Sequence, residues 1–170
     1  ERKEGKSKEL VNYSIDRLIV RKDGGVAILA ESFNRAERSY YDYYMQTYIY
    51  HYYYHYGSIM LLSINPSGEI KWANVVSKDQ NSVDDGGYTS SYISGVVNGK
   101  IVNLYNKAVD EKSPVQMTTV DGMGTQKTDV LFNENAKVVI VPKSAKQIDE
   151  DTIVMPAYKQ NRFYIMKITF

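Results

Sequence analysis

The 170-residue chain contains no cysteine, only four prolines and a single tryptophan. The lack of cysteine excludes a disulfide framework and thiolate metal sites. No apolar run approaches the roughly 18 residues that a transmembrane helix needs. Neither sign of charge predominates, because 21 Lys and Arg residues face 20 Asp and Glu residues, for a net charge of +1. Since the basic residues are scattered rather than clustered, nucleic acid is not an expected partner.

Short apolar runs are abundant, and 43% of the residues are hydrophobic, as in a chain that forms a core. The runs are rich in Val, Ile and Tyr and alternate with turn residues, whereas helical spacing is almost nowhere sustained, so an all-β fold is predicted. Residues 1–9 are charged and aperiodic, which is typical of a lead-in or linker. The predicted strands cover 15–20, 26–33, 59–64, 70–76, 92–97, 101–105, 115–120, 128–132, 138–141, 152–157 and 163–170.

Two hairpin types recur in the same order along the chain. Tight turns are indicated at 23–25 and 98–99, where Gly and Asn accept positive φ, and a second turn type is indicated at 65–68 and 121–124. The repeating unit of about 50 residues with four strands has the size of a propeller blade. We therefore expect an all-β fold of antiparallel four-stranded blade repeats, with about three blades of a larger β-propeller at 10–78, 79–133 and 134–170.

Three blades do not close a ring, because propellers have about four to eight. The last strand, 163–170, would be the third of its blade, and an unpaired apolar edge invites aggregation. The missing sheets are expected from an upstream part of the same polypeptide or from another chain. Pro156 lies inside a predicted strand and argues against the register expected there.

The blade plan places the tight turns on one rim and the long connections on the opposite rim. These connections are 34–57, 77–88, 106–114 and 133–145, and binding residues concentrate on such loops when a rigid scaffold holds them. The long-loop rim is therefore the predicted functional face.

Sixteen residues are tyrosines, and ten of them fall between Tyr40 and Tyr56. This stretch predicts a long β-hairpin arm at 34–57 that bends near 45–47. The rings either pair across the two strands and support the hairpin, or they form a contact surface for a protein or a glycan. The candidate partner-binding residues are Tyr40, Tyr41, Tyr43, Tyr44, Tyr48, Tyr50, Tyr52 and Tyr54.

Two further aromatic residues, Trp72 and Tyr88, are candidates for glycan stacking. For Trp72 the alternative is packing within a blade. The sequence does not distinguish these two roles, so both remain open.

No motif predicts a metal site, a cofactor or a catalytic residue. On a strand, His51 and His55 would lie roughly 13 Å apart, which is too far for a shared ion. The acidic turn 84–87 lacks the alternating carboxylates of calcium loops. Glu31, Asp84 and Asp85 could form an acid/base pair for glycoside hydrolysis only if they met at the loop rim. The chain is therefore expected to be non-enzymatic.

Three segments carry a resemblance to a known group of proteins: LVNYSIDRLIVRKDGGVAILAES, GSIMLLSINPSGEIKWANVV and DDGGYTSSY. With the Tyr-rich insertion between the first two, residues 10–170 resemble the C-terminal half of uncharacterised β-propeller-like envelope proteins of Bacteroidota. The resemblance implies an exported protein, periplasmic or associated with the outer membrane or cell surface, and a subunit of a larger complex. It implies no activity.

The leading hypothesis is a binding or assembly module that engages a protein partner in the cell envelope through the long-loop rim and the arm. A glycan-binding or glycan-active propeller is the alternative. A structural segment with no ligand of its own is the third.

Overall fold

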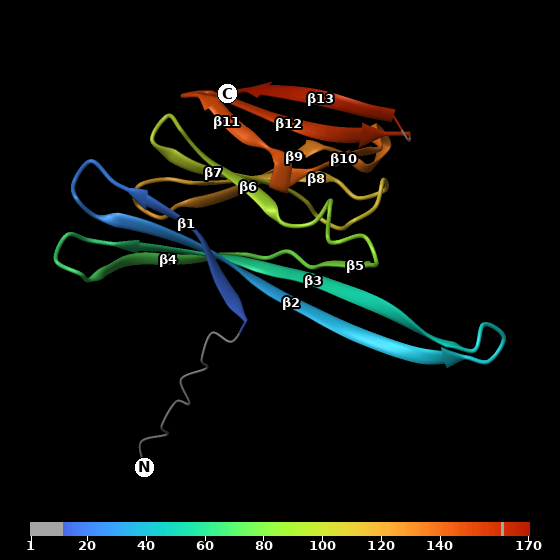
Figure 1. Ribbon diagram of the computed structural model, residues 1–170. Helices are drawn as coiled ribbons and strands as arrows, with labels where there is room; N and C mark the ends of the chain where they lie inside the picture. Colours follow the sequence, from blue (N-terminus) through green and yellow to red (C-terminus); the bar gives the residue numbers. More distant parts are fainter. Residues whose placement is uncertain (1–11, 161) are drawn as a thin grey trace, which may run out of the picture.

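A computed structural model describes residues 12–160 and 162–170, so the expected lead-in at 1–9 lies outside the described residues. The described chain forms three antiparallel sheets that lie in successive layers (Figure 1). The prediction of an all-β fold with antiparallel sheets is confirmed. Across these two ranges the sheets do not close into a barrel or a ring.

Sheet A has the strand order β1-β2-β3-β4, and a fifth strand, β5, also pairs with β3. Sheet B has the order β6-β7-β8-β9. Their bounds are β1 (Tyr13–Val20), β2 (Val26–Asp42), β3 (Thr47–Ile64), β4 (Ile70–Val76), β5 (Gln80–Val83), β6 (Tyr92–Val97), β7 (Lys100–Asn106), β8 (Val115–Val120) and β9 (Gln126–Phe132).

Sheet C has β12 at its centre, with β13 on one side and both β10 and β11 on the other. Two 3₁₀ turns, η1 and η2, flank β10. The bounds are η1 (Glu134–Ala136), β10 (Val138–Ile140), η2 (Pro142–Ser144), β11 (Lys146–Asp149), β12 (Thr152–Lys159) and β13 (Arg162–Thr169). Strands β5 and β11 were not predicted from the sequence, because each has only four residues and a largely polar sequence.

Pro156 lies in the central strand of sheet C, where proline is normally excluded. The strand beside it is interrupted at this point: β10 pairs with residues 157–159 of β12, and β11 pairs with residues 152–154. The Pro156 carbonyl accepts a hydrogen bond from the Val141 N–H (2.9 Å). Since the N–H and C=O of one strand residue point to the same side, the N–H that proline lacks would face the interruption, and the register is retained.

Three tight turns repeat one geometry, so the turn at Gly24 belongs with those at 65–68 and 121–124 and not, as predicted, with the one at 98–99. In each, the N–H of a glycine donates to the carbonyl three residues earlier, at Arg21, Asn65 and Asp121. The glycines are Gly24, Gly68 and Gly124, with φ of 83°, 87° and 87°. The positive φ explains why glycine occupies this position in all three turns.

Two hydrophobic clusters lie between the layers. One joins sheets A and B through residues such as Leu29, Leu61 and Tyr105, and the other joins sheets B and C through residues such as Leu104 and Ile153. Strand β7 contributes alternate residues to both clusters and is buried from Ile101 to Asn106. Sheet B is therefore the middle layer, packed on both faces.

The tight turns after β1, β3, β6 and β8 lie at one end of the layers, on the left in Figure 1. The long connections and the end of the β2-β3 hairpin lie at the opposite end. The predicted separation of tight turns from long connections is thus present in the described chain.

The face of sheet A that points away from sheet B is apolar across all four main strands. Three rows of cross-strand neighbours form it, and a bulge at Asp16 places Ile15 and Leu18 on the same face although they are three residues apart. This outer face of sheet A consists of Ile15, Leu18, Val20, Val26, Ile28, Ala30, Met60, Leu62, Ile64, Ile70, Ala73 and Val75.

Candidate functional site

The arm is the distal part of the β2-β3 hairpin, from Asn34 to His55, and it projects beyond the layered sheets (Figure 1). Residues 34–42 of β2 extend over about 30 Å, at about 3.3 Å per residue. The bend occupies 43–46, close to the predicted position. The Asp42 carboxylate accepts hydrogen bonds from the N–H groups of Tyr44 (2.8 Å) and Met45 (2.9 Å), which fixes the turn at the tip.

The eight candidate tyrosines are divided among two faces and the tip. Side chains alternate along a strand, and the pairs Tyr41↔Tyr48 and Ser39↔Tyr50 place their members on one face. Tyr40 lies on the opposite face, whereas Tyr43 and Tyr44 belong to the bend. We call the shared surface the tyrosine face; it consists of Tyr41, Tyr48, Tyr50, Tyr52 and Tyr54.

The rings of the tyrosine face both pair and remain accessible. Tyr41 makes an edge contact with Tyr48 at 5.2 Å between ring centroids, and the Arg35 guanidinium lies 4.4 Å from the centroid of Tyr52. Nevertheless Tyr48 and Tyr50 remain 59% and 51% exposed. Cross-strand support and an accessible aromatic surface, which the sequence left as alternatives, coexist in this arrangement.

At the base of the arm, the tyrosine face lies on the side of sheets B and C. Tyr56 belongs to the same alternating series and is buried at the base of the arm, where its hydroxyl accepts a hydrogen bond from Lys143 Nζ (2.5 Å). The exposed tyrosines therefore continue a surface that begins inside the molecule.

Strand β5 supports the base of the arm by pairing with Tyr53–Tyr56 of β3. At its end, Asp84 Oδ1 accepts a hydrogen bond from the Tyr52 N–H (2.7 Å), and Oδ2 lies 2.6 Å from His51 Nδ1. His55 makes a separate contact, 2.9 Å from Nε2 to Asp79 Oδ1. Each histidine thus has its own aspartate. The described chain contains no group of three His, Cys, Asp or Glu side chains that could hold a metal ion.

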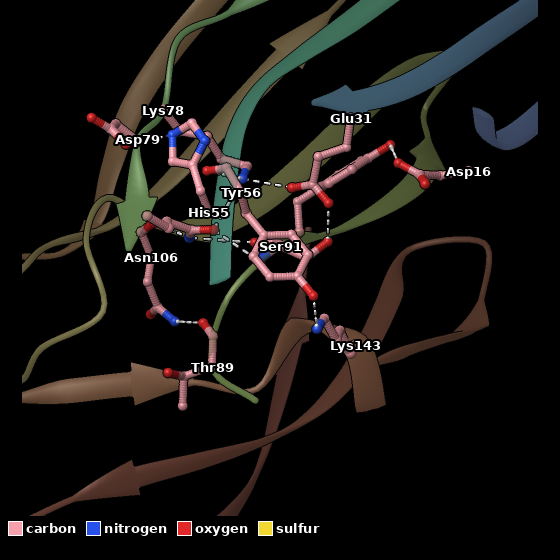
Figure 2. Close-up of polar contacts among 12 residues, drawn as sticks. Asp16, Glu31, His55, Tyr56, Lys78, Asp79, Thr89, Ser91, Asn106 and Lys143 are labelled. Carbon is pink, nitrogen blue, oxygen red and sulfur yellow. Dashed lines mark hydrogen bonds and ion pairs between the residues drawn. The ribbon is translucent and has the colours of Figure 1, made fainter. Parts of the chain in front are cut away.

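A buried ion pair lies beneath the arm (Figure 2). Lys78 Nζ lies 2.5 Å from Glu31 Oε1, and the side chains are 0% and 5% exposed. The same ammonium donates to Gln80 Oε1 (3.0 Å) and to the Tyr56 carbonyl (3.3 Å). The other carboxylate oxygen of Glu31 accepts a hydrogen bond from Ser91 Oγ (2.6 Å). The ammonium therefore has one ion-pair partner and two hydrogen-bond acceptors, which offset the loss of hydration.

Two buried amides extend this network to the other sheets (Figure 2). Gln80 Nε2 donates to the Asn106 carbonyl (2.6 Å), and Gln80 Oε1 accepts from the Ser91 N–H (2.7 Å). The Asn106 side chain exchanges hydrogen bonds with both backbone groups of Ile140 and donates to the Thr89 carbonyl (2.7 Å). We call Glu31, Lys78, Gln80, Ser91 and Asn106 the polar clamp, because together they join β2, β5, β7 and β10.

Burial dominates the electrostatics of the clamp. It raises the pKa of the Glu31 carboxyl and lowers the pKa of the Lys78 ammonium, because desolvation disfavours both charged forms, while each charge opposes the shift of the other. Nearby, Asp16 accepts a hydrogen bond from the Tyr92 hydroxyl (3.0 Å), and burial raises the pKa of both groups. The exposed Asp84 behaves oppositely: hydrogen bonds from the Tyr52 N–H and His51 lower its pKa.

The three carboxylates considered for glycoside chemistry have separate partners. Glu31 is committed to the buried ion pair, and Asp84 contacts His51 and the Tyr52 N–H. Asp85 accepts hydrogen bonds from Ser82 Oγ (2.6 Å) and the Gly87 N–H (2.7 Å). Their contacts are therefore structural: Glu31 lies in the interior, Asp84 at the end of β5, and Asp85 in the turn that follows.

The two candidate glycan-stacking residues lie at opposite ends of the molecule. Trp72 donates to the Gly122 carbonyl (3.3 Å) in the turn after β8 and covers Gly124, where an added Cβ would lie 2.7 Å from Trp72 Cγ. Tyr88 lies in the connection between β5 and β6, 6.2 Å from Tyr158 between ring centroids. Trp72 therefore has a packing role between sheets A and B, and the two rings do not form one platform.

Of the polar clamp, only Glu31 was a candidate from the sequence, and it was a candidate for glycoside chemistry rather than for this network. Asn106 ends a mostly apolar run, which is a weak signal for a buried polar group, whereas Gln80 follows the polar residues 77–79 and carries no such signal. Their partners lie 26 and 34 residues away, in segments whose approach depends on layer packing.

Comparison with known proteins identifies no relative: no family matches the chain, and neither curated proteins nor solved structures show significant similarity to it. Within residues 12–160 and 162–170, the structure has no helix with the length and apolar character needed to cross a membrane.

Proposed function

We propose that this chain is a non-enzymatic assembly module whose arm binds a protein partner. The observation that carries the proposal is the tyrosine face: an accessible aromatic surface on a projecting hairpin whose base is joined to three sheets by the polar clamp. Tyrosine rings are rigid, and each combines a large apolar area with a hydroxyl, so they contribute strongly to protein interfaces.

The clamp supports a binding role because it limits the motion of the arm. A two-stranded hairpin alone is marginally stable in water. Here β5 adds a third strand at the base, and Lys143 contacts the Tyr56 ring and hydroxyl from the side of sheet C. An arm held in one orientation loses less conformational entropy when it binds.

The layered sheets support a scaffold of the propeller type. Sheets A and B each have four main strands in chain order, and the long connections gather at one end, as in blades. We infer that the chain contributes three blades to a larger β-propeller in a bacterial cell-envelope complex, at the periplasmic or outer-membrane surface, as the sequence resemblance implies.

A matched pair of triple variants tests the arm. Tyr48→Ser, Tyr50→Ser and Tyr52→Ser remove three of the five rings of the tyrosine face. Tyr40→Ser, Ile49→Ser and Tyr53→Ser change the opposite face of the same arm. Proteins that co-purify with the tagged chain from envelope extracts are quantified by mass spectrometry. We expect the first variant to lose its partner at least about tenfold and the second to retain it.

A variant with a shortened arm provides a second test. Replacing 39–50 by Asn-Gly joins Arg38 to His51, which are cross-strand neighbours, and keeps the His51–Asp84 contact and the clamp. Thermal unfolding should then match the parent while partner recovery falls. Equal recovery by the parent, the shortened arm and the tyrosine-face variant would refute the binding role.

A further inference from the structure

The outer face of sheet A is more uniformly apolar than the face of the same sheet that is buried. One of its rows runs Leu18, Ile28, Leu62 and Ala73 across the four strands, and all twelve positions of the face are apolar. The buried face, in contrast, includes Arg17, Glu31, Ser63 and Asn74.

The apolar side chains on β1 and β4 are exposed, those on β2 and β3 are half-buried, and only Ala30 among the twelve is buried. Val20 is 77% exposed, Ile15 and Ile70 are each 66% exposed, and Leu18 is 62% exposed. A contiguous apolar patch that extends over four strands marks an interaction surface rather than ordinary surface scatter.

The rest of the molecule shows which kind of surface covers such a face. Sheet B is covered on both faces by sheets, with apolar clusters between the layers. Sheet C has its own outward face, where Pro156↔Ile165 and Tyr158↔Phe163 are cross-strand pairs. Phe163 and Ile165 are 55% and 64% exposed, and Lys146 and Lys167 flank Val154 on the same side. Sheet C thus offers an apolar centre with a basic rim, as many interfaces do.

We propose that the outer face of sheet A packs against the outward face of sheet C in a second copy of this chain. This proposal rests on the proposed blade-like layering and continues it by one layer at each end. A twofold rotation makes the two A-to-C contacts equivalent and closes the assembly. Two copies with three sheets each form a ring of six sheets, within the range of about four to eight found in propellers.

Sedimentation equilibrium of the chain over a wide concentration range tests the stoichiometry. We expect a reversible equilibrium between one and two copies. Leu62→Lys places a charge at the centre of the apolar face and should weaken association at least about tenfold. Val130→Lys changes an exposed apolar residue on sheet B, outside the proposed contact, and should leave association unchanged. Far-ultraviolet circular dichroism shows whether each variant folds. If Leu62→Lys does not fold, Val75→Glu is used in its place.

Cross-linking tests the orientation, and the absence of native cysteine makes it specific. Leu18→Cys and Ile165→Cys chains are mixed under mild oxidation. We expect the mixed disulfide to form faster than either disulfide between identical variants. A chain that remains a single copy at all concentrations, or a preferred Leu18-to-Leu18 link, would overturn the proposal. The shortened arm should associate like the parent, so a failure here is distinguishable from a failure of the arm to bind its partner.

Discussion

Substitution of Lys78 by methionine should destabilise the chain far more than removal of an exposed lysine. Methionine retains the length and apolar stem of the side chain but removes the ammonium, leaving the Glu31 carboxylate buried beside it. Breaking a buried pair from one side costs about 3–5 kcal/mol. Gln80 Oε1 and the Tyr56 carbonyl also lose a donor, so we expect the upper part of this range.

Urea unfolding followed by circular dichroism measures this loss. With a slope of about 2 kcal/mol per molar urea, the midpoint should fall by about 2–2.5 M. Lys127→Met is the matched control, because Lys127 forms an exposed pair with Asp129 (2.9 Å). Its effect should remain within about 0.5 kcal/mol. If the two lysine variants unfold at similar urea concentrations, the clamp does not hold the base of the arm together.

The pH dependence of the Lys78→Met variant identifies the orphaned carboxylate as the cause. Burial raises the pKa of Glu31, and Lys78 opposes this rise, so removing Lys78 raises that pKa further. Between its ordinary value of 4.5 and this raised value, the folded chain binds a proton that the unfolded chain has lost. Stability of the variant should therefore fall as pH increases through this window. Adding Glu31→Gln should abolish this trend, and persistence of the trend would contradict the assignment to Glu31.

Two further predictions concern local geometry. Gly68→Ala and Gly124→Ala introduce a Cβ at the same φ of 87°, but only at Gly124 would this Cβ lie 2.7 Å from Trp72. Gly124→Ala should therefore lower the melting temperature clearly more than Gly68→Ala. Equal effects would exclude packing by Trp72 as the reason. Because the pKa of Asp84 is lowered, its support of the arm should be present above its ordinary value of 3.8 and lost as pH falls through its lower folded value. Hydrogen exchange at the Tyr52 N–H, corrected for intrinsic rates, should show a loss of protection at acidic pH in the parent but not in Asp84→Asn. Protection that does not change with pH in the parent would refute this role of Asp84.

Local features of the fold could be predicted from the sequence, whereas long-range features could not. Gly24, Gly68 and Gly124 identified their turns because positive φ is a property of the residue itself. The alternation of Tyr48, Tyr50, Tyr52 and Tyr54 indicated a strand, and pairing across the bend followed from their position between two apolar runs. The sequence predicted the eight candidate tyrosines as one set, whereas Tyr40 and the bend residues Tyr43 and Tyr44 do not share the face of the others.

The short strands and the interruption in sheet C had no comparable local signal. Both β5 and β11 form because a partner strand provides unpaired backbone groups, and their own sequences are mostly polar. The place of Pro156 shows the same dependence on context, since proline is accepted only because η2 interrupts the neighbouring strand.

Local residue chemistry was thus sufficient for the class of the fold, the tight turns, the hairpin arm and the end of the molecule where long connections gather. Those properties depend on backbone preferences and on alternation within one segment. The joining of Glu31 to Lys78, of Gln80 to Asn106 and of Asn106 to Ile140 arose from layer packing. Buried polar groups find whichever partners the stacking of sheets brings within hydrogen-bonding distance, and that distance is set by the whole assembly of strands rather than by neighbouring residues.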